Sequence, residues 1–210
     1  MPLRMGVLIS GSGTNLQSLI NNVENGYING KISVVISNKE DAYGLERARK
    51  HNIPAVFINQ RHYDCFEKFN DEIMEVLEKH QVDIVVLAGY LKILSHKFIE
   101  NYKNKIINIH PSLIPSFCGK GFYGLKVHEA AISYGVKVSG ATVHFVDEGA
   151  DTGPIILQET VNVDYNDTAE SLQQKILKIE HKLLPLAVKL LCEEKIEVEG
   201  RKVKIKELNN

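Results

Sequence analysis

Short apolar runs that alternate with helical patterns constrain the fold of this chain more than any other feature. The runs that we predict to be strands lie at residues 5–10, 32–36, 55–58, 83–88 and 106–109. In the longest intervening segment, 63–80, apolar residues recur every three or four positions, as in an amphipathic helix. Strands joined by helices form parallel βαβ units. We therefore expect an α/β fold: a mostly parallel twisted sheet with helices on both faces.

Beyond residue 110 the pattern changes toward antiparallel strands. Residues 111–123 contain two prolines and two glycines and read as a long loop, of the kind used for lids or binding. Residues 139–146 alternate between apolar and polar side chains and predict a strand. The segment 155–163 predicts another strand, partly exposed, which is close enough in sequence to pair with it in antiparallel fashion.

The last part of the chain is predicted to form a long helix followed by a small hairpin. Thr168 is expected to begin a long helix, and Pro185 to kink or interrupt it, because proline cannot donate the helical hydrogen bond. Residues 193–206 predict a small hairpin with Gly200 at its turn.

Length and composition fit a single globular domain over residues 1–210, with 44% hydrophobic residues and a net charge of −1. A balanced charge does not favour nucleic acid or an anionic membrane as a partner, and no stretch has the length of a membrane span or signal peptide. The mixed charges of 199–210, Glu207 among them, indicate a solvated tail. The three cysteines are far apart and form no CxxC pair, so we expect neither a disulfide framework nor a zinc site. We therefore expect the protein to be located in the reducing cytoplasm.

A glycine loop follows the first predicted strand and precedes a helix. Its sequence, GSGTN at 11–15, would point backbone N–H groups and a helix N-terminus at an anion, with Thr14 and Asn15 as further donors. The loop is neither a Walker A motif nor a complete GxGxxG, because residue 16 is Leu. Two interpretations stay open: a phosphate site, or a tight turn in which Ser or Thr caps the helix.

The predicted strand at 106–109 contains Asn108 and is followed by His110 and Pro111. Residues two apart in a strand point to the same side, so Asn108 and His110 are expected to share a face. Asn offers a neutral donor for an oxyanion, and His offers a proton that moves near neutral pH. The alternative is that both are hydrogen-bonded turn residues.

Asp151 precedes Thr-Gly-Pro and is expected in a tight turn. A carboxylate beside His110 would raise the imidazole pKa and fix its orientation. The alternative is an ordinary turn aspartate that bonds its own backbone. The segments 11–15, 89–94 and 147–151 each follow a predicted strand, as His110 does. We therefore expect these polar loops to converge at one edge of the sheet.

Three motifs together carry a resemblance. They are LISGSGTN at 8–15, NIHPSLIP at 108–115 and DTGPII at 151–156. The chain resembles the phosphoribosylglycinamide formyltransferases, within the formyl-folate transferase family, over about residues 5–185. The Asn-His-Pro-Ser motif is shared with formyl-folate hydrolases, and the amino-terminal loop narrows the resemblance to the glycinamide ribonucleotide enzymes.

The resemblance implies a Rossmann-like formyltransferase fold and a defined reaction. The formyl group of 10-formyltetrahydrofolate, a co-substrate, would pass to the amine of N1-(5-phospho-D-ribosyl)glycinamide in de novo purine biosynthesis, without a metal. Asn108 would donate to the formyl oxygen, and His110 would act as acid, base and electrostatic partner. Asp151 would orient His110 and help to remove the amine proton through water.

The resemblance also implies two sets of binding residues. Gly13, Thr14 and Asn15 would bind the phosphate of glycinamide ribonucleotide, and Glu180 its ribose or glycyl end. The pocket for the folate would be lined by Leu91, Lys92, Ile93, Leu94, Asn108, Val146 and Asp147.

Several positions depart from the family or stay open. Phe66 stands near the position where relatives use a basic side chain for the folate glutamate, and Cys118 where they often carry proline. Lys120 is either an anion contact or a solvated charge, and His144 is expected to support the site or pack in the core rather than react.

Three other functions are weighed against the transferase. Methionyl-tRNA formyltransferase would need a further carboxyl-terminal domain, and about 20 residues follow the predicted helix. Formyltetrahydrofolate hydrolase would carry an amino-terminal regulatory domain. A non-enzymatic nucleotide-binding module would leave Asn108, His110 and Asp151 unexplained. Either a monomer or a homodimer is compatible with the sequence.

Overall fold

The computed structural model describes residues 2–206. Met1 and residues 207–210 lie outside the described residues, and so does the part of the expected solvated tail that includes Glu207. The chain divides into two compact units, Met1–Ile107 and Asn108–Asn210. Each unit is described in turn, and a single domain over 1–210 stays a prediction.

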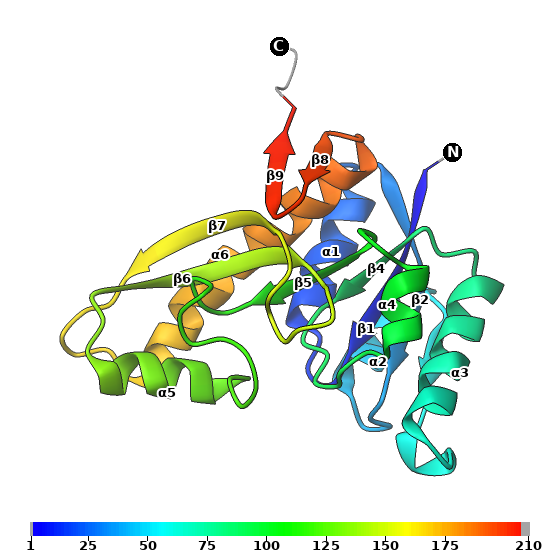
Figure 1. Ribbon diagram of the computed structural model, residues 1–210, viewed down its shortest axis with the longest axis horizontal. Coiled ribbons are helices and arrows are strands. Elements are labelled where there is room, and N and C mark those ends of the chain that lie inside the picture. The colour runs from blue at the N-terminus through cyan, green and yellow to red at the C-terminus, as the bar shows by residue number, and fades with distance from the viewer. Residues whose placement is uncertain (1, 207–210) are drawn as a thin grey trace. The chain divides into compact units, whose positions relative to one another are not determined.

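The first unit is built from parallel strands in the order β3-β2-β1-β4, of which β1, β2 and β4 are labelled in Figure 1. The strands are β1 (Leu3–Ile9), β2 (Gly30–Ser37), β3 (Ala55–Phe57) and β4 (Ile84–Leu87). The inner strands β1 and β4 are almost wholly buried, as their continuous apolar sequences require. The prediction of parallel βαβ units is confirmed here.

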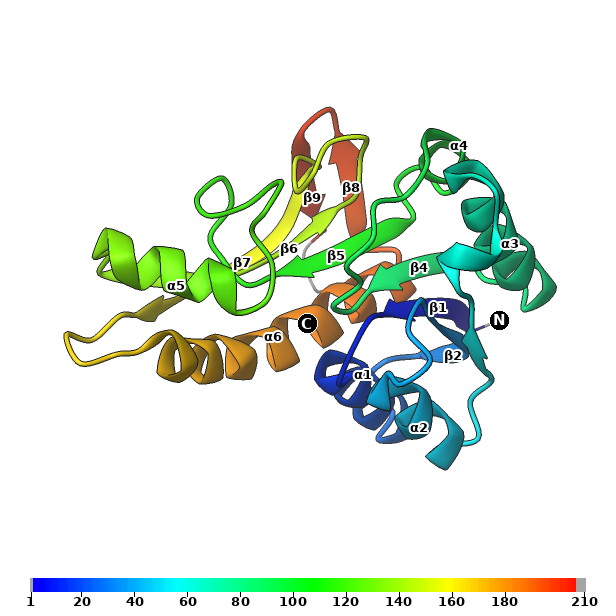
Figure 2. The same ribbon diagram turned by 90° about the horizontal axis from the view of Figure 1, so that it is seen from below.

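Helices cover both faces of these strands. They are α1 (Thr14–Glu24), α2 (Tyr43–Lys50), α3 (Phe66–Lys79) and α4 (His96–Asn101), with a short 3-10 turn η1 (Gln60–His62) before α3. Figure 2 shows α1 and α2 on one face and α3 and α4 on the other. Phe69 and Phe98 anchor α3 and α4 in the core, and the Ser95 hydroxyl caps α4 by accepting from Phe98 N at 3.2 Å.

The β1–β2 pairing contains one irregularity. Met5 pairs with Ile32 and Gly6 with Val34, so Ser33 is an extra residue in β2 that has no counterpart in β1. An extra residue of this kind is a β-bulge, which bends the strand and re-aims its side chains.

The strand β5 (Ile106–His110) spans the boundary between the units, and its last three residues belong to the second unit. In the second unit the strand order is β5-β6-β7. The strands β6 (Val138–Phe145) and β7 (Ile155–Asn162) are antiparallel, as predicted, and β7 is partly exposed. The chain is therefore a mostly parallel α/β fold with antiparallel strands in its carboxyl-terminal part.

Two helices and a hairpin complete the second unit. The helices are α5 (Leu125–Tyr134) and α6 (Ala169–Cys192), and the hairpin pairs β8 (Ile196–Glu199) with β9 (Lys202–Ile205). Thr168 caps α6 in a capping box with Ser171. Pro185 does not interrupt α6, because the helix continues to Cys192, and a kink at Pro185 stays a prediction. Pro185 lies on the buried face, where packing outweighs the lost backbone hydrogen bond.

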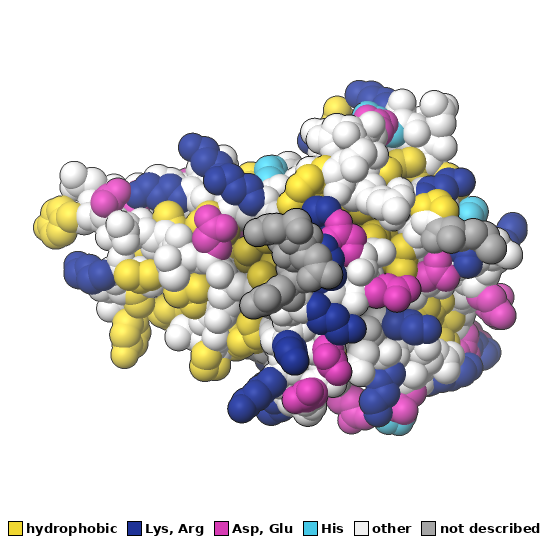
Figure 3. All heavy atoms as spheres, turned by 90° about the horizontal axis from the view of Figure 1, so that it is seen from above, with side chains coloured by type: hydrophobic (Ala, Val, Ile, Leu, Met, Phe, Trp, Pro, Cys, Tyr) yellow, Lys and Arg dark blue, Asp and Glu magenta, His cyan; other side chains and the backbone are white. Residues whose placement is uncertain are grey.

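The surface agrees with the balanced composition. On the face shown in Figure 3, basic and acidic side chains are interspersed rather than separated. Within residues 2–206, no helix is both long enough and apolar enough to cross a membrane.

Candidate functional site

The end of β5 brings Asn108 and His110 to one place, as their spacing predicts. His110 is buried, with 4% of its surface exposed, and Asn108 is half-buried. Both side chains reach the same carboxylate, that of Asp151. Pro111 follows at once and directs the chain into the loop 111–123.

The Asp151 carboxylate is the centre of this cluster. Its Oδ1 lies 3.4 Å from Asn108 Nδ2 and 3.6 Å from His144 Nε2. Its Oδ2 accepts a hydrogen bond from Gly119 N at 2.9 Å and lies 3.6 Å from His110 Nδ1. Asp151 has a positive φ of 58°, which places it in the expected turn. The carboxylate thus serves distant residues, which argues against an ordinary turn aspartate.

His144 belongs to the cluster more directly than the sequence indicated. It is almost fully buried, and its Nδ1 lies 2.8 Å from Phe145 O. A carbonyl oxygen only accepts, so Nδ1 carries the proton and donates it. In the neutral imidazole the other nitrogen, Nε2, then accepts from Asn108 Nδ2 at 3.2 Å. His144 therefore holds the Asn108 amide in place.

The loop after β5 contacts both His110 and Asp151. His110 Nε2 lies 2.9 Å from Phe117 O, so this nitrogen donates to the carbonyl and Nδ1 faces Asp151. Gly119 N binds the Asp151 carboxylate. The long loop predicted at 111–123 is thus tied to both His110 and Asp151.

The Asp151 carboxylate raises the pKa of His110, as expected, but the net shift of this pKa is downward. Burial lowers the pKa of His110, and this outweighs the opposite effect of the nearby Asp151 carboxylate. Burial also raises the pKa of Asp151, but His144, His110 and Gly119 together bring the pKa of this carboxyl below its ordinary value. At neutral pH the pair is a neutral imidazole beside a carboxylate.

His128 is a buried titratable residue that sequence reasoning missed. It lies on α5 with 2% of its surface exposed, and its Nδ1 has no hydrogen-bond partner among the described residues. Burial, and then the charge of His110, lowers the pKa of His128 to about 4. The available signal was its place between the apolar Val127 and Ala131 on the buried face of α5.

The glycine loop of the first unit has an open helix N-terminus. Gly13 is the N-cap of α1 with a φ of 69°, and no side chain caps the helix. The interpretation of a turn capped by Ser or Thr is therefore wrong. Arg47 Nε donates to Ser12 O at 2.9 Å, which places a cation beside the loop that the motif did not reveal. An uncapped helix N-terminus and a nearby cation favour an anion here.

The residues expected at the folate do not all present side chains to solvent. Leu91 and Ile93 are exposed, at 50% and 73%, whereas Leu94 is buried in the core of the first unit. Leu91 N donates to Ser10 Oγ at 2.9 Å, which fixes the start of this turn. Leu94 therefore does not present its side chain to a ligand in this structure.

The remaining predicted positions lie as follows. Val146 and Asp147 are half-buried, and Asp147 Oδ1 accepts from Gly149 N at 3.2 Å and from Thr152 Oγ1. Glu180 is buried in α6. Three positions left open by the sequence are the half-buried Phe66 at the start of α3, the half-buried Cys118 and the exposed Lys120.

Neither a reactive thiol nor a metal cluster is supported by these positions. Burial raises the pKa of the Cys118 thiol, so it is not an activated thiolate. Within residues 2–206, His, Cys, Asp and Glu side chains form no group of three or more that could hold a metal ion.

The chain is similar to known formyl transferases over most of its length. The family model described as formyl transferase matches residues 3–188. The phosphoribosylglycinamide formyltransferase of Haemophilus influenzae is 40% identical, over 93% of this chain and 90% of that protein. The crystal structure of glycinamide ribonucleotide transformylase 1 from Symbiobacterium toebii has a TM-score of 0.94 at 44% identity, and the match covers 98% of this chain and 95% of that one.

Some relatives are longer than this chain. The chloroplastic phosphoribosylglycinamide formyltransferase of Arabidopsis thaliana is 40% identical over 92% of this chain, which spans 67% of that protein. For the corresponding protein of Vigna unguiculata the span is 62%. The family match nevertheless covers most of the described residues and includes Asn108, His110 and Asp151. The chain belongs to the formyl transferase family.

Proposed function

We propose that this chain transfers the formyl group of 10-formyltetrahydrofolate to the amine of N1-(5-phospho-D-ribosyl)glycinamide. The products are the N-formyl ribonucleotide and tetrahydrofolate, in a step of de novo purine biosynthesis. The single observation that carries the proposal is the Asp151 carboxylate, which lies within 3.6 Å of His110 and His144 and within 3.4 Å of Asn108. Relatives named for this reaction, such as that of Haemophilus influenzae, support it.

The chemistry needs a donor for an oxyanion and a route for a proton. The amine attacks the formyl carbon, a C–N bond forms, and the carbonyl electron pair moves to oxygen. Asn108 Nδ2 is oriented by His144 and donates to that oxygen. The neutral His110 imidazole exchanges a proton with the tetrahedral intermediate, and Asp151 accepts the amine proton through water. Collapse breaks the bond to the folate nitrogen, which takes up a proton.

The binding residues are assigned by the same proposal. Gly13, Thr14 and Asn15 bind the phosphate, and the uncapped N-terminus of α1 supports this assignment. Glu180 binds the ribose or glycyl end. The folate is contacted by Leu91, Lys92, Ile93, Leu94, Asn108, Val146 and Asp147.

A two-arm absorbance assay tests this function. Conversion of 10-formyltetrahydrofolate to tetrahydrofolate is followed with and without glycinamide ribonucleotide. The proposal predicts conversion that requires the ribonucleotide. Conversion without it would instead identify a formyltetrahydrofolate hydrolase. Binding of the ribonucleotide without any conversion would identify a nucleotide-binding module.

The location and assembly of the protein are also proposals. The described cysteines are unpaired, which supports a cytoplasmic location, although an Arabidopsis relative is named chloroplastic. A monomer or a homodimer is proposed, with small molecules rather than nucleic acid or membrane as partners. Light scattering coupled to size-exclusion chromatography measures the assembly directly.

A further inference from the structure

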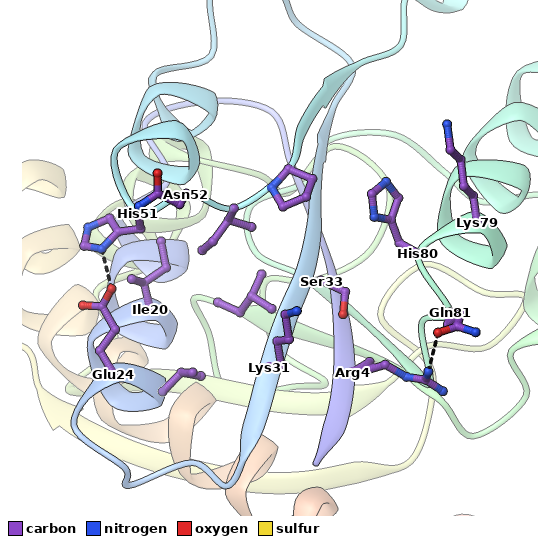
Figure 4. Close-up of a pocket in the computed structure, with 14 residues that line it drawn as sticks. Arg4, Ile20, Glu24, Lys31, Ser33, His51, Asn52, Lys79, His80 and Gln81 are labelled. Carbon is purple, nitrogen blue, oxygen red and sulfur yellow. Dashed lines mark hydrogen bonds and ion pairs between the residues drawn. The ribbon is translucent and has the colours of Figure 1, made fainter. Parts of the chain in front are cut away.

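A cavity of about 610 Å³ lies in the first unit, at the end of the parallel strands opposite the glycine loop. Arg4 and Lys31, near the starts of β1 and β2, line it, whereas residues 11–15 follow the other end of β1. The end of α1 and the turns after α2 and α3 complete the wall (Figure 4). None of the residues assigned to the proposed reaction lines this cavity.

The charges around the cavity favour an anion. Arg4 is engaged by Asp83, with hydrogen bonds of 3.1 Å, and Glu24 is held by His51 at 2.6 Å (Figure 4 shows the second pair). Lys31 and Lys79 also line the cavity, and neither has a hydrogen-bond or ion-pair partner in the part of the chain that the structure describes. Two unpaired cations thus remain on a chain whose net charge is −1.

Ser33 supports a ligand site in this cavity independently of the lysines. It is the bulge residue of β2, and only 8% of its surface is exposed. Its hydroxyl has no hydrogen-bond partner among residues 2–206, and Figure 4 shows its side chain directed to the side of β2 on which Arg4 and His80 lie. The Ser33 hydroxyl is therefore open to a ligand, and bulges often re-aim a side chain at a binding site. A ligand oxygen in the cavity would supply the missing partner.

The other side of the cavity is apolar. Ile20 and Val23 of α1 and Ile53 and Pro54 of the turn before β3 line it. We propose that this cavity binds a small organic oxyanion, a phosphate ester or a carboxylate on an apolar body. The oxyanion binds Lys31, Lys79 and the Ser33 hydroxyl, and the apolar body packs against the α1 side.

Residue-resolved NMR titration of the full chain tests the proposal. The probes are phenyl phosphate, benzoate and the neutral benzyl alcohol, and the readout is the amide shifts of 31–33 and 79–81. We expect saturable shifts with at least one of the two anions and much weaker shifts with the alcohol. The two anions separate a phosphate site from a carboxylate site. Shifts at 11–15 report the glycine loop separately.

Three variants sharpen the test. Lys31→Glu and Lys79→Glu should each raise the apparent Kd of the bound anion about tenfold, and Ser33→Ala should raise it several-fold. The matched control is Lys137→Glu, an exposed lysine of the second unit with the same change of charge. An unchanged Kd in all three folded variants would overturn the proposal. So would shifts confined to 11–15, or equal shifts with benzyl alcohol.

Discussion

Replacing Asp151 by Asn removes the charge of the central carboxylate while keeping its shape. The Asn oxygen can still accept from Gly119 N, so the turn is retained. What is lost is the attraction between the carboxylate and a proton on His110, whose Nδ1 lies 3.6 Å away. Two unit charges about 4 Å apart interact by about 4 kcal/mol at an effective dielectric constant of about 20. We treat this value as an upper limit for the loss.

A loss of about 4 kcal/mol in transition-state stabilisation corresponds to a fall in kcat of about 10³-fold. The same variant loses the acceptor for the amine proton, an effect of comparable size. We therefore expect kcat of Asp151→Asn to fall by about 10² to 10⁴, with a smaller change in KM. The assay is the ribonucleotide-dependent conversion of 10-formyltetrahydrofolate.

The control is Asp164→Asn, which removes an exposed carboxylate paired with Lys175 in the same unit. Its kcat should match the wild type. Thermal melting shows whether each variant is folded. A folded Asp151→Asn protein with kcat within about threefold of the wild type would refute the assigned role of Asp151.

Three further predictions concern binding and stability. Asn15→Ala should raise KM for the ribonucleotide about tenfold through a lost phosphate contact, and an effect limited to KM for the folate would contradict the assignment. Gly13→Ala should lower the melting temperature, because φ is 69° and the new Cβ would lie 2.7 Å from Gly44 Cα; an unchanged melting temperature would speak against this strain. The buried His128 has a pKa of about 4, below its ordinary value of 6.5. As the pH falls from about 6.5 to about 4, the unfolded chain therefore takes up the His128 proton before the folded chain does, and the free energy of unfolding decreases. Melting curves of His128→Gln should show a weaker pH dependence in that window, and an identical dependence would disprove the contribution of His128.

The sheet and its helices were largely predictable because their signals are local. The continuous apolar run of β4 reflects burial on both faces, and the spacing of apolar residues in α3 reflects its single buried face. Whether Pro185 ends the helix could not be decided from the sequence, because local propensity says nothing of the packing that holds α6 together on both sides of it.

The candidate site was predictable only in part. The spacing of Asn108 and His110 is a local property, and the sheet topology accounts for their meeting with Asp151. The direct contact between His144 and Asn108 is a tertiary property without a local signal. The net direction of the His110 pKa shift could not be predicted for the same reason: the sequence shows a possible partner but not the depth of burial.

The most direct measurement follows the formyl group itself. The protein is incubated with glycinamide ribonucleotide and 10-formyltetrahydrofolate that carries ¹³C in the formyl group, and the products are identified by mass spectrometry. The proposed function predicts that the label appears in the N-formyl ribonucleotide, in an amount equal to the tetrahydrofolate formed. Label recovered as free formate, or retained in the folate, would contradict it.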